Sequence, residues 1–100
     1  MYAIHLESLT NSNQDKIKLL VDKMSFQIYV FSLKPEESIK NETFNSIHQI
    51  RVESGYGYIK TTQEIIRIEP GTVLFFENEM FYMIKNDSLS ILKFNVIINV

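Results

Sequence analysis

Two side chains, His48 and Tyr82, could carry acid/base chemistry. Histidine titrates near neutral pH, so His48 could move a proton in catalysis or contact a ligand. The structural alternative is a buried, neutral imidazole hydrogen-bonded to a neighbour, because burying it without a partner costs about 1–3 kcal/mol. We favour the structural alternative and keep the functional one open. His5, the other of the two histidines, lies near the N-terminus and is expected on the surface.

The composition excludes several other kinds of chemistry. No cysteine occurs among the 100 residues, which excludes disulfides, thiolate catalysis and thiolate metal ligands. The formal net charge is −2, and the Lys and Arg residues are scattered singly, so we expect no nucleic-acid partner. The first residues lack the features of a signal peptide, and no stretch reaches the ~18 apolar residues of a membrane span. We therefore expect a cytoplasmic protein without a membrane partner.

The sequence consists of short apolar runs, with turn-forming residues about every ten positions. These runs predict the strands that must position His48 and Tyr82. The pattern is typical of an all-β sandwich or barrel of about eight short antiparallel strands. The clearest strand covers residues 26–33 and ends at Lys34-Pro35-Glu36-Glu37. Further strands are expected at residues 47–53, 58–60, 64–68, 72–76, 81–85 and 89–98.

The strand over residues 47–53 gives the clearest facing prediction. Its two-residue alternation places His48, Ile50 and Val52 on one face. The other face carries polar residues and should meet water or a polar partner.

Residues 13–24 allow two predictions. Apolar residues recur at helical spacing from Ile17 to Met24, and Ser12 or Asn13 could cap such a helix. Residues 16–21 could equally form a strand, and the all-β context favours the strand.

The segment from Pro70 to Asn86 contains a spacing known from a protein family. Tyr82 follows Gly71 by eleven residues, and Asn86 follows Tyr82 by four. This spacing resembles the second motif of the cupin superfamily, with Tyr82 where that family has a metal-binding histidine. Lys34-Pro35-Glu36-Glu37 likewise resembles the family's Pro-Gly turn, with Glu36 replacing the glycine.

The end of the first cupin motif is similar to residues 47–55, with Gly55 on its final glycine and His48 in the place of its metal-binding glutamate. The resemblance to small RmlC-like cupins covers about residues 26–97. It implies one cupin-type jelly roll, or double-stranded β-helix, over residues 1–100, with the barrel at 26–98.

The resemblance also implies a homodimer, because many small cupins dimerise by packing sheets or by exchanging an N-terminal strand. Residues 1–25 would be the N-terminal strand region, and residues 2–6 the exchanged strand. Phe75, Phe76 and residues 89–100 are apolar on both faces, so a second surface should cover them.

The metal ligands of the family are replaced in this chain. Its two motif histidines would fall on Glu42 and Phe44, or on Asn41 and Thr43, depending on the spacing. The phenol of Tyr82 is a poor ligand for a divalent ion at neutral pH, and a single imidazole does not hold a metal against water. We expect no metal and no other cofactor.

By the resemblance, His48 and Tyr82 point into the barrel from opposing strands, where a hydrogen bond would satisfy both. Glu42, Glu77 and Glu79 would flank the mouth of the barrel. A ligand pocket there would be lined by His48, Tyr82, Ile50, Val52, Phe75, Ile84 and Glu42.

We therefore expect a metal-free small cupin that is not an enzyme and that binds a small molecule or serves as a non-catalytic dimeric module. One alternative is a metal-independent isomerase with His48 and Tyr82 as base and acid, as in the sugar-nucleotide epimerases of this superfamily. The others are a metal-dependent oxygenase with unusual ligands and a regulatory sensor.

Overall fold

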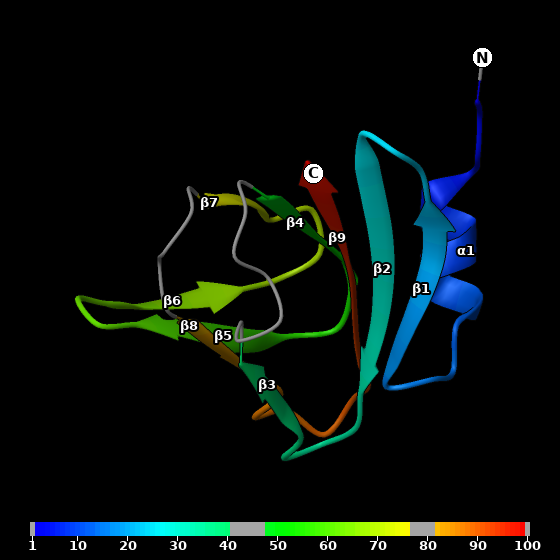
Figure 1. Ribbon diagram of the computed structural model, residues 1–100. Helices are drawn as coiled ribbons and strands as arrows, with labels where there is room; N and C mark the ends of the chain where they lie inside the picture. Colours follow the sequence, from blue (N-terminus) through cyan, green and yellow to red (C-terminus); the bar gives the residue numbers. More distant parts are fainter. Residues whose placement is uncertain (1, 41–47, 77–81, 100) are drawn as a thin grey trace.

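Two antiparallel sheets enclose the core in the computed structural model, which describes residues 2–40, 48–76 and 82–99 (Figure 1). One sheet has the strand order β1-β2-β9-β4-β7, and the other has the order β3-β8-β5-β6. The elements are α1 (Leu6–Ser12), β1 (Ile17–Asp22), β2 (Phe26–Leu33), β3 (Ser38–Lys40), β4 (His48–Ser54), β5 (Gly57–Thr61), β6 (Ile65–Ile68), β7 (Val73–Phe76), β8 (Tyr82–Lys85) and β9 (Leu92–Asn99).

Among the described strands, the chain changes sheet at every step along the sequence except from β1 to β2 and from β5 to β6. This alternation produces a jelly roll, so the predicted all-β fold is confirmed.

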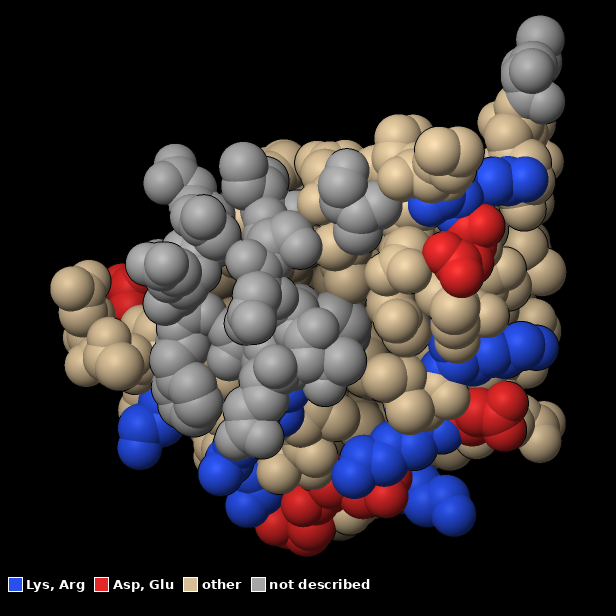
Figure 2. Space-filling view, in the orientation of Figure 1, with Lys and Arg blue, Asp and Glu red and all other residues tan. Residues whose placement is uncertain are grey.

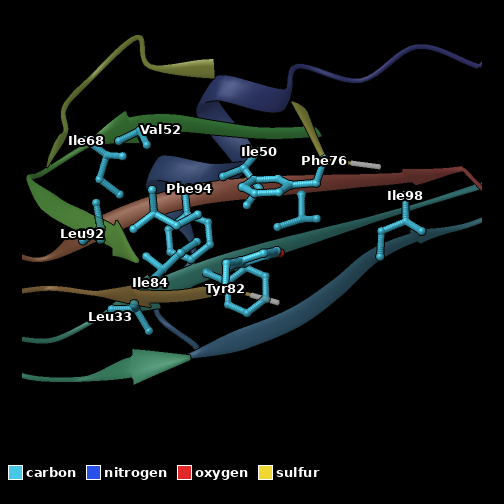
Figure 3. Packing of buried hydrophobic residues seen from close by; sticks show 13 residues of the cluster. Leu33, Ile50, Val52, Ile68, Phe76, Tyr82, Ile84, Leu92, Phe94 and Ile98 are labelled. Atoms are coloured by element: carbon cyan, nitrogen blue, oxygen red, sulfur yellow. The ribbon is translucent and has the colours of Figure 1, made fainter. Parts of the chain in front are cut away.

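The interior of the barrel is filled by alternate residues of both sheets (Figure 3). Phe31 of β2 stacks on Phe94 of β9, with ring centroids 4.7 Å apart. Burying one large apolar side chain contributes about 1.5–3 kcal/mol, so this cluster is the main source of stability. Its members are at most 6% exposed: Phe31, Leu33, Ile50, Val52, Ile59, Ile68, Phe76, Tyr82, Ile84, Leu92, Phe94, Val96 and Ile98.

Most predicted strands are present, with differences at their ends. The prediction for residues 26–33 is confirmed by β2, and the strand alternative for residues 13–24 is confirmed by β1. Strand β3 was not predicted. The last strand begins at Leu92, not at residue 89, because residues 86–91 form a turn held by the side chain of Asn86.

The two turns that contain proline share a conformation. Glu36 has a φ of 71°, and Gly71 has a φ of 90°. Each turn is closed by a backbone hydrogen bond, from Glu37 N to Lys34 O at 3.0 Å and from Thr72 N to Glu69 O at 3.0 Å. Glu36 thus adopts the left-handed conformation that usually calls for glycine.

The N-terminal region contains a helix where the sequence suggested a strand. Residues 2–5 have no regular structure, and Leu6 begins α1, so the expected strand over residues 2–6 is not present. The helix lies against the outer face of the five-stranded sheet, over β2, β4 and β9 (Figure 1). It is not long and apolar enough to cross a membrane, and it is the only helix among the residues described.

Polar side chains of β9 hold this helix in place. The Lys93 ammonium donates to the carbonyls of Asn11 and Asn13, both at 2.6 Å, and so satisfies acceptors that the end of a helix leaves open. The amide of Asn95 donates to Thr10 Oγ1 at 3.1 Å. The outward side of β9 is therefore partly polar and covered by the chain's own helix, which corrects the expectation that it is apolar on both faces.

The polar face predicted for residues 47–53 finds a partner beneath the helix. The carboxylate of Glu53 accepts a hydrogen bond from Asn95 Nδ2 at 3.1 Å and pairs with Arg51 Nε at 3.2 Å. Its side chain is only 5% exposed, so these contacts compensate for burying a charge.

Candidate functional site

His48 and Tyr82 meet inside the barrel, although they come from opposite sheets. His48 is the first residue of β4 and pairs with Phe76 of β7. Tyr82 is the first residue of β8, next to Thr61 of β5. The Nε2 atom of His48 lies 2.8 Å from the hydroxyl of Tyr82, and the imidazole tautomer decides which group donates.

A third ring completes the arrangement. Phe76 stacks on His48, with centroids 5.3 Å apart and planes 17° apart. It also stacks on Tyr82, with centroids 4.5 Å apart and planes 28° apart. We call these three residues the aromatic cluster. Figure 3 shows Phe76 and Tyr82 between Ile98 on one side and Leu33, Ile68 and Leu92 on the other.

The environment keeps the Tyr82 phenol protonated. Burial disfavours the phenolate and raises the pKa of Tyr82 far above its ordinary value of 10.0. Tyr82 is fully buried, and His48 is 2% exposed. At neutral pH the Tyr82 partner of the pair is therefore a neutral phenol, and both side chains are shielded from solvent.

The other residues predicted to line a pocket have different positions. Ile50, Val52 and Ile84 point inward, but they are fully buried members of the core. The prediction for Phe75 is wrong, because its side chain is 76% exposed on the outer face. The register that pairs Phe76 with His48 turns Phe76 inward, and the two-residue period then turns Phe75 outward.

Three further predicted residues, Glu42, Glu77 and Glu79, lie outside the described residues. Phe76 is the site residue that the sequence reasoning missed as a member of the site. Phe76 could have been found from the inward position of His48 together with the pairing of the two strands, because residues directly opposite each other point to the same face.

The residues at the motif positions do not fit a cupin metal centre. Those that the structure describes, His48 and Tyr82, offer one imidazole and a phenol that remains neutral, whereas such centres use several imidazoles and a carboxylate. Within residues 2–40, 48–76 and 82–99 no three His, Cys, Asp or Glu side chains gather as metal ligands do. His5 is exposed beside α1, with Nδ1 2.6 Å from Ser8 Oγ.

The asparagine of the second motif has a structural position. Nδ2 of Asn86 donates to the carbonyls of Leu33 at 2.8 Å and Ser90 at 2.7 Å. Its Oδ1 accepts from the backbone N–H and the hydroxyl of Ser88, at 2.9 and 2.8 Å. Asn86 is fully buried and joins the end of β2 to the turn before β9, so it organises the fold and not the aromatic cluster.

Comparison with solved structures identifies the type of jelly roll. A Bacillus halodurans protein superimposes with a TM-score of 0.87 at 17% identity, over 98% of this chain and 80% of its own. A cupin superfamily protein of Desulfitobacterium hafniense gives a TM-score of 0.78 at 20% identity, over 99% of this chain and 91% of its own.

A Cupin_2 domain of an XRE family transcriptional regulator from Enterobacter cloacae gives a TM-score of 0.73 at 20% identity, over 84% of this chain and 94% of its own. No family profile and no curated protein sequence matches the chain. The chain is a jelly-roll protein, and its fold is the cupin fold.

Proposed function

We propose that this protein is a metal-free, non-catalytic cupin module whose barrel interior is a packed core. The observation that supports the proposal is the direct hydrogen bond of 2.8 Å between the buried His48 and Tyr82 side chains. The residues beneath the pair, among them Ile50, Val52 and Ile84, are fully buried.

The geometry of the pair argues against a role as base and acid on one substrate. A catalytic base and acid each lie about 2.6–3.2 Å from a substrate atom, so the substrate stands between them. Here the two groups bind each other, and the ring of Phe76 stacks on both. The isomerase alternative would require the pair to separate before a substrate could enter.

The oxygenase alternative would require a metal held by His48 and a neutral phenol. Burial opposes deprotonation of Tyr82, and the phenolate is the form that would bind a cation. The donor set therefore favours a hydrogen bond over a metal.

The Cupin_2 domain from the Enterobacter cloacae regulator supports the idea of a module, since a barrel of similar fold serves there as one domain of a transcriptional regulator. We further propose that the module is a homodimer. Ile17 and Leu19 on the edge strand β1 and Phe75 on β7 are 48%, 43% and 76% exposed, and a second copy could cover them.

Metal binding tests the proposal. Protein purified without an affinity tag should contain no stoichiometric transition metal. Added Fe²⁺, Mn²⁺, Ni²⁺ or Zn²⁺ should leave the NMR signals of the His48 ring unchanged. His5→Ala is the matched control, because it removes binding to the exposed imidazole. One equivalent of metal that persists in His5→Ala and is lost in His48→Ala would overturn the proposal.

A further inference from the structure

The outer face of the four-stranded sheet carries two lysines on either side of a methionine. Lys40 of β3 and Lys60 of β5 are each paired in register with Met83 of β8. Because Tyr82 and Ile84 point inward, the alternation of β8 turns Met83 outward. Adjacent strands lie about 4.8 Å apart, so the two lysine backbones are separated by roughly 10 Å and both side chains can reach a group above Met83.

These two lysines differ from the other cations of this face. Arg67 forms a bidentate pair with Asp87, at 2.5 and 3.1 Å, and Lys85 lies 3.3 Å from Glu36. None of the ion pairs in the described part of the chain includes Lys40 or Lys60. On the side of the molecule shown in Figure 2, basic and acidic side chains lie next to each other along the lower edge. Two ammonium groups on either side of Met83, with no ion-pair partner among the described residues, therefore differ from the paired cations of this face.

A hollow of about 290 Å³ lies between these side chains. It is lined by Lys40, Lys60, Thr61, Thr62 and Met83. The rim formed by the turn is held in place, because Thr61 Oγ1 accepts from the backbone N–H groups of Gln63 and Glu64 at 3.2 and 3.1 Å. This volume is near the lower end of the range for small-molecule sites, about 300–1,000 Å³.

We propose that this hollow binds a small organic anion. A carboxylate or phosphate group would bridge the ammonium groups of Lys40 and Lys60, and the apolar body of the ligand would lie on Met83. The anion offsets the repulsion between two like charges, and the methionine contributes a flexible apolar contact. The site lies outside the barrel and goes beyond the proposed function, so the two ideas can fail separately.

An NMR titration of the full chain with four probes tests this site. Phenyl phosphate and benzoate should cause saturable shifts of the backbone amides at Lys40, Lys60, Thr62 and Met83. Inorganic phosphate should bind more weakly than phenyl phosphate because it lacks the apolar body. Neutral benzamide should cause no saturable shift at these residues. The comparison of benzoate with phenyl phosphate shows which anionic group the site prefers.

Substitutions then assign the binding to the two lysines. Lys40→Gln and Lys60→Gln should each weaken phenyl phosphate binding about three- to tenfold, as expected for losing one partly exposed charge contact. Lys18→Gln is the matched control, since Lys18 is an exposed lysine on β1 in the other sheet. The proposal is overturned by equal binding of benzamide, by no saturable shift with either aromatic anion, or by the same effect in Lys18→Gln.

Discussion

Replacing Tyr82 by phenylalanine isolates the hydrogen bond of the aromatic cluster. The substitution removes the hydroxyl that lies 2.8 Å from His48 Nε2 and leaves a ring that can still stack on Phe76. Tyr82 is fully buried, so water cannot replace the lost bond without entering the core. A broken buried hydrogen bond costs about 1–3 kcal/mol. For a domain of this size that corresponds to a fall in Tm of about 4–8 °C per kcal/mol.

Chemical denaturation and thermal unfolding of four variants, Tyr82→Phe, His48→Phe, the double variant and Tyr56→Phe, would measure this cost. Tyr56→Phe removes a hydroxyl from a side chain that is 52% exposed and should change the free energy of unfolding by less than about 0.5 kcal/mol. The double variant His48→Phe/Tyr82→Phe replaces both polar partners by apolar rings. Its loss of stability should be smaller than the sum of the losses in His48→Phe and Tyr82→Phe. Each single variant leaves the other side chain buried without this hydrogen-bond partner, whereas the double variant removes both.

The refuting result is a Tyr82→Phe protein as stable as the unsubstituted chain, with single effects that add in the double variant. That result would mean that the hydrogen bond contributes nothing to the packed interior, and that the pair is available for another role.

Four further outcomes are expected. Because burial raises the pKa of Tyr82 above 10.0, the unfolded chain loses the phenol proton at a lower pH than the folded protein does. The free energy of unfolding should therefore not depend on this group below about pH 10 and should fall as the pH rises further. The fall should be less steep in Tyr82→Phe. Asn86→Ala should lower the free energy of unfolding by about 2–4 kcal/mol in chemical denaturation, since a fully buried side chain loses four hydrogen bonds. Gly55→Ala should prevent stable folding, because its Cβ would lie 2.3 Å from the carbonyl oxygen of Ile91. Gly71→Ala has open space around its Cβ and should lower the free energy of unfolding by only about 1–2 kcal/mol. Equal melting temperatures of the two variants would contradict this. Light scattering at micromolar concentration should give a dimer mass, and a monomer mass would disprove the proposed dimer.

Local sequence patterns predicted the elements that have a clear two-residue period. Strand β2 matches the predicted bounds, and in β4 the alternation correctly placed His48 with Ile50 and Val52 on the inner face. Strand β3 has three residues, too few to show a period, and its Ile39 is paired with Ile84 of a distant strand. Such a strand is defined by its neighbours and not by its own residues.

The helix α1 could not be predicted for a similar reason. Its seven residues are too few to stabilise an isolated helix. The side chains that hold it are far along the chain: Lys93 lies 82 positions after its partner Asn11, and Asn95 lies 85 positions after Thr10. Single-sequence periodicity contains no information about contacts of that separation.

The candidate site was predicted in part. The resemblance to cupins implied that His48 and Tyr82 point into the barrel, and the hydrogen bond expected between them is present in the structure. The prediction for Phe75 was wrong because either of two adjacent phenylalanines can point into the barrel. Only the pairing of β7 with β4 shows that Phe76 is the inward one. Whether the barrel binds a ligand at this pair stays a prediction.

The contacts that hold α1 also set an order of events during synthesis. The helix leaves the ribosome before its partners Lys93 and Asn95, which follow it by 80 to 85 positions on β9. Until β9 joins the sheet, the N-terminal residues have no place to dock. The outer face of the five-stranded sheet therefore stays uncovered until β9 has emerged and paired with β2 and β4.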